Sequence, residues 1–139
     1  MRLKKRYAVV AALVGAIAAI SAVAFAGSPH FVTADATRSG NTLTATFKEA
    51  GLGNEPQVHV VLSATALCIN NGGKHPKAVN KTSVNAAGDF PVQNGKAEGT
   101  LSVTATFQPD CSPPMTVAFT NVTLTDETSG VTANIPGTF

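Results

Sequence analysis

Tryptophan is absent from this chain of 139 residues, and its single tyrosine is Tyr7, close to the start. Tryptophan and tyrosine supply most sugar-stacking platforms and most anchors of tight protein interfaces, because each joins a large flat face to a polar tip. Their absence beyond Tyr7 counts against a typical carbohydrate-binding module and against a tight interface anchored by aromatic residues. The remaining aromatic residues after the first 26 positions are Phe31, Phe47, Phe90, Phe107, Phe119 and Phe139.

Basic residues are few, and several of them stand at the very start, at Arg2, Lys4, Lys5 and Arg6. An apolar run from Ala8 to Phe25 follows, and it closes on Ala24-Phe25-Ala26, a small-x-small triplet of the kind that signal peptidase cuts. The sequence therefore predicts a secretory signal peptide, 1–26, cleaved between Ala26 and Gly27. An uncleaved membrane anchor is the alternative, because about 18 apolar residues can just span a bilayer. The segment is rich in alanine and would insert only weakly into a membrane, which favours cleavage. After cleavage we expect no attachment to the membrane.

Removal of the first 26 of the 139 residues leaves 113, at positions 27–139, which suffice for one small domain with a single core. Cleavage also reverses the net charge, from +2 for the whole chain to −2, because four of the ten basic residues leave and all eight acidic ones stay. A mildly acidic domain without a basic stripe is a poor candidate for binding nucleic acid. We expect a secreted monomer with an unknown extracellular or cell-wall partner.

Cysteine occurs only at Cys68 and Cys111. An even pair in an exported protein predicts one disulfide, which would contribute about 4 kcal/mol on the chain-entropy model. The alternative is a nucleophilic or redox-active cysteine. It is disfavoured by the oxidising compartment and by the absence of a C-x-x-C motif.

Apolar and polar residues alternate over 41–47, 57–68, 99–107 and 131–135, which is typical of strands with one buried face. The alternation places Cys68 on the inward face of its strand. The apolar phase changes between Phe119 and Val122, which predicts a β-bulge or a switch between sheets near Thr120-Asn121. Asn94-Gly95 is the strongest hairpin signal, because both residues tolerate the positive φ of a type I′ turn.

About seven short strands with one disulfide predict an all-β fold. We expect an immunoglobulin-like two-sheet sandwich preceded by a helical signal peptide. A closed barrel is the alternative.

The most distinctive stretch follows the first cysteine. It comprises Asn71, Gly72, Gly73, Lys74, His75, Lys77 and Lys81. Glycines allow successive N–H groups to point one way, as in anion-binding nests, and three lysines add positive charge. One hypothesis is therefore an anion-binding loop for a phosphate, a carboxylate or an anionic wall polymer. The other is a solvated, glycine-rich connection that the lysines keep soluble.

Signals of chemistry are otherwise weak. His59 lies on the polar phase of its strand, where a structural role is expected. Asp126-Glu127 lacks the dense oxygen-ligand spacing of a calcium loop, and no histidine spacing indicates zinc. There is no Gly-x-Ser-x-Gly elbow. We therefore predict no catalytic residue, metal or cofactor, and a protein that is not an enzyme.

Two segments carry a resemblance to known proteins: Phe47-Lys-Glu-Ala-Gly-Leu-Gly-Asn54, and the Asn-x-Gly-Gly-x-His-Pro-Lys-Ala core at 70–78. With Thr120-Asn-Val-Thr-Leu-Thr-Asp126, they resemble a family of small uncharacterised secreted actinobacterial β-sandwich proteins. The resemblance implies a secreted all-β protein and supplies no catalytic residues. The Ala50-Gly51-Leu52 turn is also similar to one in the apoproteins of enediyne antibiotics, which cradle an apolar chromophore but have two cysteine pairs.

These observations predict a secreted, non-enzymatic binding or surface-interaction module of unknown partner. A small-ligand carrier is the alternative, and a small secreted hydrolase is the third hypothesis. A carrier needs an apolar cavity lined by Phe and Leu. A surface module needs a filled core and an exposed apolar or charged patch, and a hydrolase needs a cleft with converging titratable groups.

Overall fold

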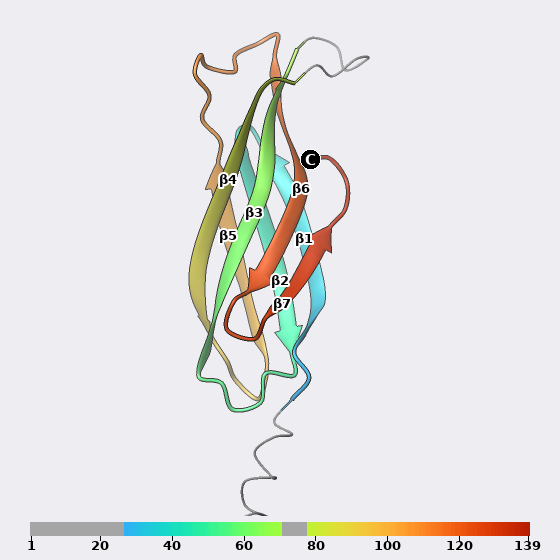
Figure 1. Ribbon diagram of the computed structural model, residues 1–139, viewed down its shortest axis with the longest axis vertical. Helices are drawn as coiled ribbons and strands as arrows, with labels where there is room; N and C mark the ends of the chain where they lie inside the picture. The colour runs from blue at the N-terminus through green and yellow to red at the C-terminus, as the bar shows by residue number, and fades with distance from the viewer. Residues whose placement is uncertain (1–26, 71–77) are drawn as a thin grey trace, which may run out of the picture.

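The computed structural model describes residues 27–70 and 78–139, which form two antiparallel sheets (Figure 1). The strands are β1 (His30–Ser39), β2 (Thr42–Ala50), β3 (Gln57–Ile69), β4 (Ala78–Pro91), β5 (Ala97–Thr104), β6 (Thr116–Asp126) and β7 (Val131–Ile135). One sheet has the order β1-β2-β5 and the other β4-β3-β6-β7, and they pack face to face. The predicted two-sheet sandwich is confirmed, and the closed barrel is wrong because the sheets remain separate. The predicted helical signal peptide lies outside the described residues.

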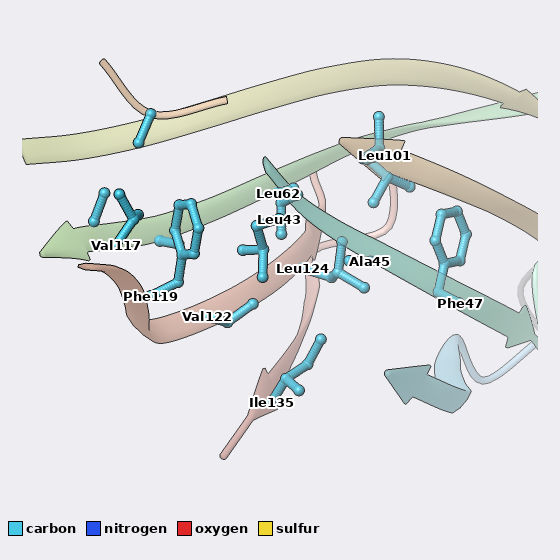
Figure 2. Close-up of a cluster of buried hydrophobic side chains, with 14 of the residues drawn as sticks. Leu43, Ala45, Phe47, Leu62, Leu101, Val117, Phe119, Val122, Leu124 and Ile135 are labelled. Atoms are coloured by element: carbon cyan, nitrogen blue, oxygen red, sulfur yellow. The ribbon is translucent and has the colours of Figure 1, made fainter. Parts of the chain in front are cut away.

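The core lies between the sheets, and the strict alternation of β2 and β3 supplies much of it (Figure 2). On β2, the apolar residues Leu43, Ala45 and Phe47 face inward and are buried. On β3, every second side chain from Val58 to Cys68 is buried. Burial of such side chains contributes about 25 cal/mol per Å² of apolar area, so both sheets depend on this shared layer.

The change of phase in β6 is a β-bulge. Asn121 has a φ of 52°, and the register of β6 against β3 shifts at this point. Phe119 before the bulge and Val122 after it are both buried, although they would face opposite sides of a regular strand. The predicted irregularity near Thr120-Asn121 is confirmed.

The Asn94-Gly95 hairpin is also confirmed. Both residues have positive φ, 54° and 74°, as a type I′ turn requires. Gln93 and Lys96 exchange two backbone hydrogen bonds of 2.8 and 3.0 Å around them. The turn delivers the chain from the end of β4 to the start of β5.

Strand β4 was not recognised in the sequence, because its inward positions carry small or polar residues such as Thr82, Ala86 and Gly88. It is an edge strand, held to β3 along its whole length. Phe90 provides the large apolar contact, with its ring 5.0 Å from that of Phe47 in an edge-to-face arrangement. A Cβ at Gly99 would lie 2.2 Å from the Phe90 ring, so only glycine leaves room for this contact.

The predicted disulfide joins Cys68, buried at the end of β3, to Cys111 in the connection between β5 and β6, with the two Cα atoms 5.7 Å apart. Such bonds are typical of proteins in oxidising environments. The strand predicted over 99–107 ends earlier, at Thr104, but Ala105 and Phe107 keep the inward phase and remain buried.

Candidate functional site

The predicted loop falls largely outside the described residues. This holds for Asn71, Gly72, Gly73, Lys74, His75 and Lys77. Lys81 is described, and it lies exposed on β4 opposite Leu67 of β3. Anion binding by this loop therefore stays a prediction. Of the predicted cleavage site, Ala26 is outside the described residues. Gly27 packs so closely that a Cβ there would lie 2.1 Å from the Gly51 carbonyl oxygen.

The outer face of the three-stranded sheet is covered by hydroxyl groups. Its first three rows across β1, β2 and β5 are Ser39-Thr42-Thr104, Thr37-Thr44-Ser102 and Asp35-Thr46-Thr100. Eight of these nine positions carry a hydroxyl, and Asp35 is the exception. We call this surface the hydroxyl face.

The hydroxyl face is regular because a sheet spaces its side chains evenly. Neighbouring strands lie about 4.8 Å apart, and residues on one face of a strand repeat about every 6.7 Å. Two pairs of side chains bond across the strands: Thr42 Oγ1 lies 2.8 Å from Thr104 Oγ1, and Thr44 Oγ1 lies 3.0 Å from Ser102 Oγ. The result is an ordered layer of donors and acceptors with little charge.

A depression of about 600 Å³ adjoins the hydroxyl face at the next row along the sheet. Lys48, Glu98 and Lys96 line it together with Val32, a large apolar side chain that is 57% exposed. The side chain of Val32 is exposed because the register of β1 shifts between Phe31 and Thr33. Next to the hydroxyl face, the outer surface of this sheet therefore carries charged and apolar side chains around the depression.

Two carboxyl groups lie inside the sandwich. Glu49 is 1% exposed and Asp126 is 0% exposed, and they are the buried charged side chains of the described residues. Asp126 Oδ1 accepts hydrogen bonds from the backbone N–H groups of Thr128 and Ser129, at 2.8 and 3.1 Å. Asp126 Oδ2 and both carboxyl oxygens of Glu49 have no partner. Burial, and after it the proximity of Asp126, raises the pKa of Glu49 to about 8. We call these two residues the carboxyl pair.

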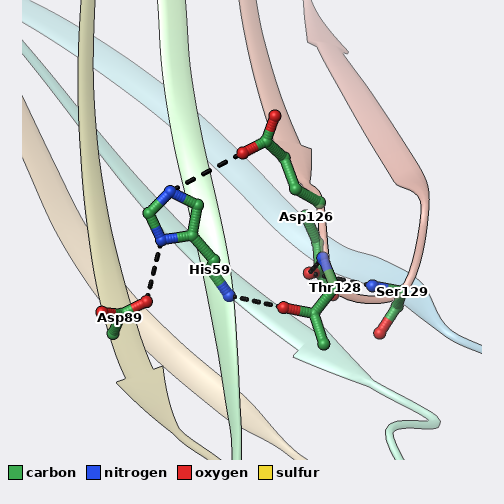
Figure 3. A network of polar contacts seen from close by, with 6 residues as sticks. His59, Asp89, Asp126, Thr128 and Ser129 are labelled. Atoms are coloured by element: carbon green, nitrogen blue, oxygen red, sulfur yellow. Dashed lines mark hydrogen bonds and ion pairs between the residues drawn. The ribbon is translucent and has the colours of Figure 1, made fainter.

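His59 lies on the outer face of the four-stranded sheet, beside the turn that follows Asp126 (Figure 3). Its Nδ1 is 2.8 Å from Asp89 Oδ1 on β4, and its Nε2 is 3.6 Å from Glu127 Oε1. The hydrogen bond to Asp89 is the main reason why the pKa of His59 is raised, although the ring is well exposed to solvent. The outward position predicted for His59 is confirmed.

The backbone ties His59 to the same turn. The His59 N–H donates to Thr128 Oγ1 at 2.9 Å, and the Glu127 N–H donates to the His59 carbonyl oxygen at 2.9 Å. The turn that holds Asp126 is therefore anchored on β3. No group of three or more His, Cys, Asp or Glu side chains suited to a metal ion occurs in the ranges 27–70 and 78–139.

The carboxyl pair was not predicted from the sequence, although the alternation of the two strands contains a signal for it. Glu49 continues the inward phase of Ala45 and Phe47, and Asp126 continues that of Val122 and Leu124. The signal is an acidic residue at a strand position where the alternation otherwise places inward-facing apolar side chains. In the sequence Asp126 stands out only together with its neighbour Glu127, whereas the other buried carboxyl group, Glu49, is on the other sheet.

Comparison with known proteins gives no assignment: no family model, no curated protein and no solved structure matches this chain. No helix long and apolar enough to cross a membrane occurs among the residues that the structure describes.

Proposed function

We propose that this protein is a secreted, non-enzymatic surface-interaction module that binds an extended, uncharged polymer outside the cell through its hydroxyl face. The observation that carries the proposal is the array of eight hydroxyl side chains in three aligned rows. Each hydroxyl both donates and accepts hydrogen bonds, which suits a polyhydroxyl polymer such as a cell-wall glycan. Recognition would rest on these hydrogen bonds, without the Trp and Tyr stacking of a typical carbohydrate-binding module. Strand order favours an immunoglobulin-like sandwich as the scaffold, and the disulfide favours an extracellular location.

The interior supports this proposal over the small-ligand carrier. Buried side chains from both sheets fill the space between them, and several are fully inaccessible. A depression of about 720 Å³ lies against the turns, lined by residues such as Gly53, Asn54 and Gly95. A carrier would instead need a cavity lined by the buried Phe and Leu side chains.

The hydrolase hypothesis has less support. Its titratable groups would have to reach a substrate, whereas Glu49 and Asp126 are almost inaccessible to solvent. The similarity to secreted actinobacterial proteins is compatible with a surface module.

The test is a binding assay on purified cell wall of the producing cells and on an insoluble neutral glucan. In the variant Thr44→Val with Thr46→Val, shape and strand preference are kept while two hydroxyls are lost. We expect affinity to fall about thirtyfold, because each of the two lost hydrogen bonds contributes on the order of 1 kcal/mol.

The matched control is Thr125→Val with Thr132→Val, which removes a comparable pair on the other sheet, where the two Oγ1 atoms are 3.1 Å apart. Affinity should be unchanged in the control. Equal losses in both double variants, or full binding by the hydroxyl-face variant, would overturn the proposal.

A further inference from the structure

The two residues of the carboxyl pair come from different sheets and are both buried in the core. Glu49 lies on β2, with Phe31 of β1 and Ala97 of β5 as its cross-strand partners. Asp126 lies on β6, with Val60 of β3 and Val131 of β7 as its partners. The neighbours on all four adjacent strands are therefore apolar. Apart from the two backbone N–H groups that donate to Asp126 Oδ1, no polar cross-strand partner among the described residues faces either carboxyl group.

No buried cation of the described residues compensates these groups, because Glu49 and Asp126 are themselves the buried charged side chains there. The charged groups nearby belong to the outer faces. Lys48 and Glu98 lie exposed on the outside of the three-stranded sheet. Lys96, which lines the same depression as Glu49, is also exposed to solvent. His59 lies outside the four-stranded sheet, where it contacts Asp89 and Glu127.

The hydrogen bonds distinguish the two carboxyl groups. Asp126 Oδ1 accepts hydrogen bonds from two backbone N–H groups. Glu49 has no donor at either oxygen. Two ionised carboxylates would leave adjacent like charges in a low-dielectric core, whereas one proton on Glu49 supplies a donor for the free Asp126 Oδ2.

From this geometry we infer that Glu49 and Asp126 share one proton inside the core, and that this proton acts as a pH-sensitive latch between the two sheets. With the proton present, Glu49 donates to Asp126 and the end of β2 is held against the end of β6. When the proton is lost, the two carboxylates repel each other and draw water, and this end of the sandwich loosens. The latch is independent of any partner of the hydroxyl face.

The test compares the disulfide-intact wild-type protein with Glu49→Gln, which keeps the shape of the side chain but cannot ionise. Urea unfolding is measured from pH 5 to pH 9. Folding of the wild type takes up one proton at this site, so its unfolding constant should rise about tenfold per pH unit between pH 5.5 and 7.5, relative to Glu49→Gln. Glu98→Gln, an exposed change on β5, is the matched control and should follow the wild type.

Infrared spectroscopy gives a readout that does not depend on stability. The wild type at pH 7 should show the carbonyl stretch of a protonated carboxyl group, which Glu49→Gln should lack. A wild-type protein without this band, or an unfolding constant with the same pH dependence in Glu49→Gln, would overturn the latch.

A bound cation is the other way to neutralise the pair, and the same experiment distinguishes it. Calcium chloride at pH 7 would then raise the urea midpoint of the wild type and leave that of Glu49→Gln unchanged, which would overturn the shared proton. If calcium leaves both midpoints unchanged while the pH dependence is present only in the wild type, the latch is supported.

Discussion

The two ends of the sandwich interior are closed by different chemistry. Along the antiparallel pair of β3 and β6, Cys68 lies opposite Val117 at one end, and Val60 lies opposite Asp126 at the other. The first end is held by a covalent bond to Cys111. The second is held by the carboxyl pair and by the turn that carries Asp126.

The difference shows that one core can respond to two separate conditions. The disulfide end is held by a cross-link that depends on redox conditions. The carboxyl end is indifferent to thiols but holds a buried proton, so its stability depends on pH. The two contributions should therefore be separable by experiment.

The largest expected effect on stability comes from removing the disulfide in the double variant Cys68→Ala with Cys111→Ala. The bond spans 43 residues, so its loss should lower the free energy of unfolding by about 4 kcal/mol on the chain-entropy model. Calorimetry should show a melting temperature lower by on the order of 15 °C. The pH dependence of unfolding should persist, and its disappearance would mean that the two ends are not independent.

A smaller effect is expected at the carboxyl end. The folded-state pKa of Glu49, about 8, exceeds its usual value of 4.5, so the stabilisation from this group is complete below pH 4.5 and is lost as pH rises through about 8. Between pH 5.5 and 7.5 the wild type should lose about 3 kcal/mol of unfolding free energy from this group.

Asp126→Asn sharpens this prediction, because the asparagine oxygen can still accept from the Thr128 and Ser129 N–H groups. The substitution removes the like charge but leaves burial, which is the larger cause of the raised pKa. The pH at which stability falls should therefore move below that of the wild type and remain above 4.5. Urea titrations at several pH values measure it, and an unchanged profile would show that Asp126 does not act on Glu49.

Much of the fold could be predicted because alternation is a local property. The inward residues of β2 and β3, the bulge at Asn121 and the Asn94-Gly95 turn all follow from a few neighbouring residues. Strand β4 could not be recognised in the same way. It is stabilised by pairing with β3 and by the contact of Phe90 with Phe47, rather than by a strong apolar pattern of its own.

The candidate sites depend on contacts between residues that are far apart in the sequence. The hydroxyl face exists because the register aligns Thr44 with both Thr37 and Ser102, which are far apart in sequence. Likewise, Glu49 and Asp126 become partners only when the two sheets pack. The alternation of each strand predicts that both side chains face inward. Their proximity could not be predicted, because it depends on how the sheet of β2 packs on the sheet of β6.

The smallest effect is expected just outside the carboxyl end, at His59. Asp89→Asn should lower the pKa of His59 towards 6.5, because the hydrogen bond to Asp89 is the main cause of the raised value. Stabilisation by a raised histidine pKa is complete below the usual pKa of 6.5 and is lost as pH rises through the folded-state value. The change in stability should be slight because the ion pair is exposed to solvent.

An NMR titration of the His59 ring measures this shift directly, and Glu49→Gln provides the comparison. Asp126 contributes less to the pKa of His59 than Asp89 does, and Glu49 is not among its causes. The His59 titration should therefore change in Asp89→Asn and remain almost the same in Glu49→Gln. Equal shifts in both variants would mean that the inner and outer groups at this end titrate as one coupled cluster, and the proton could then no longer be assigned to the carboxyl pair alone.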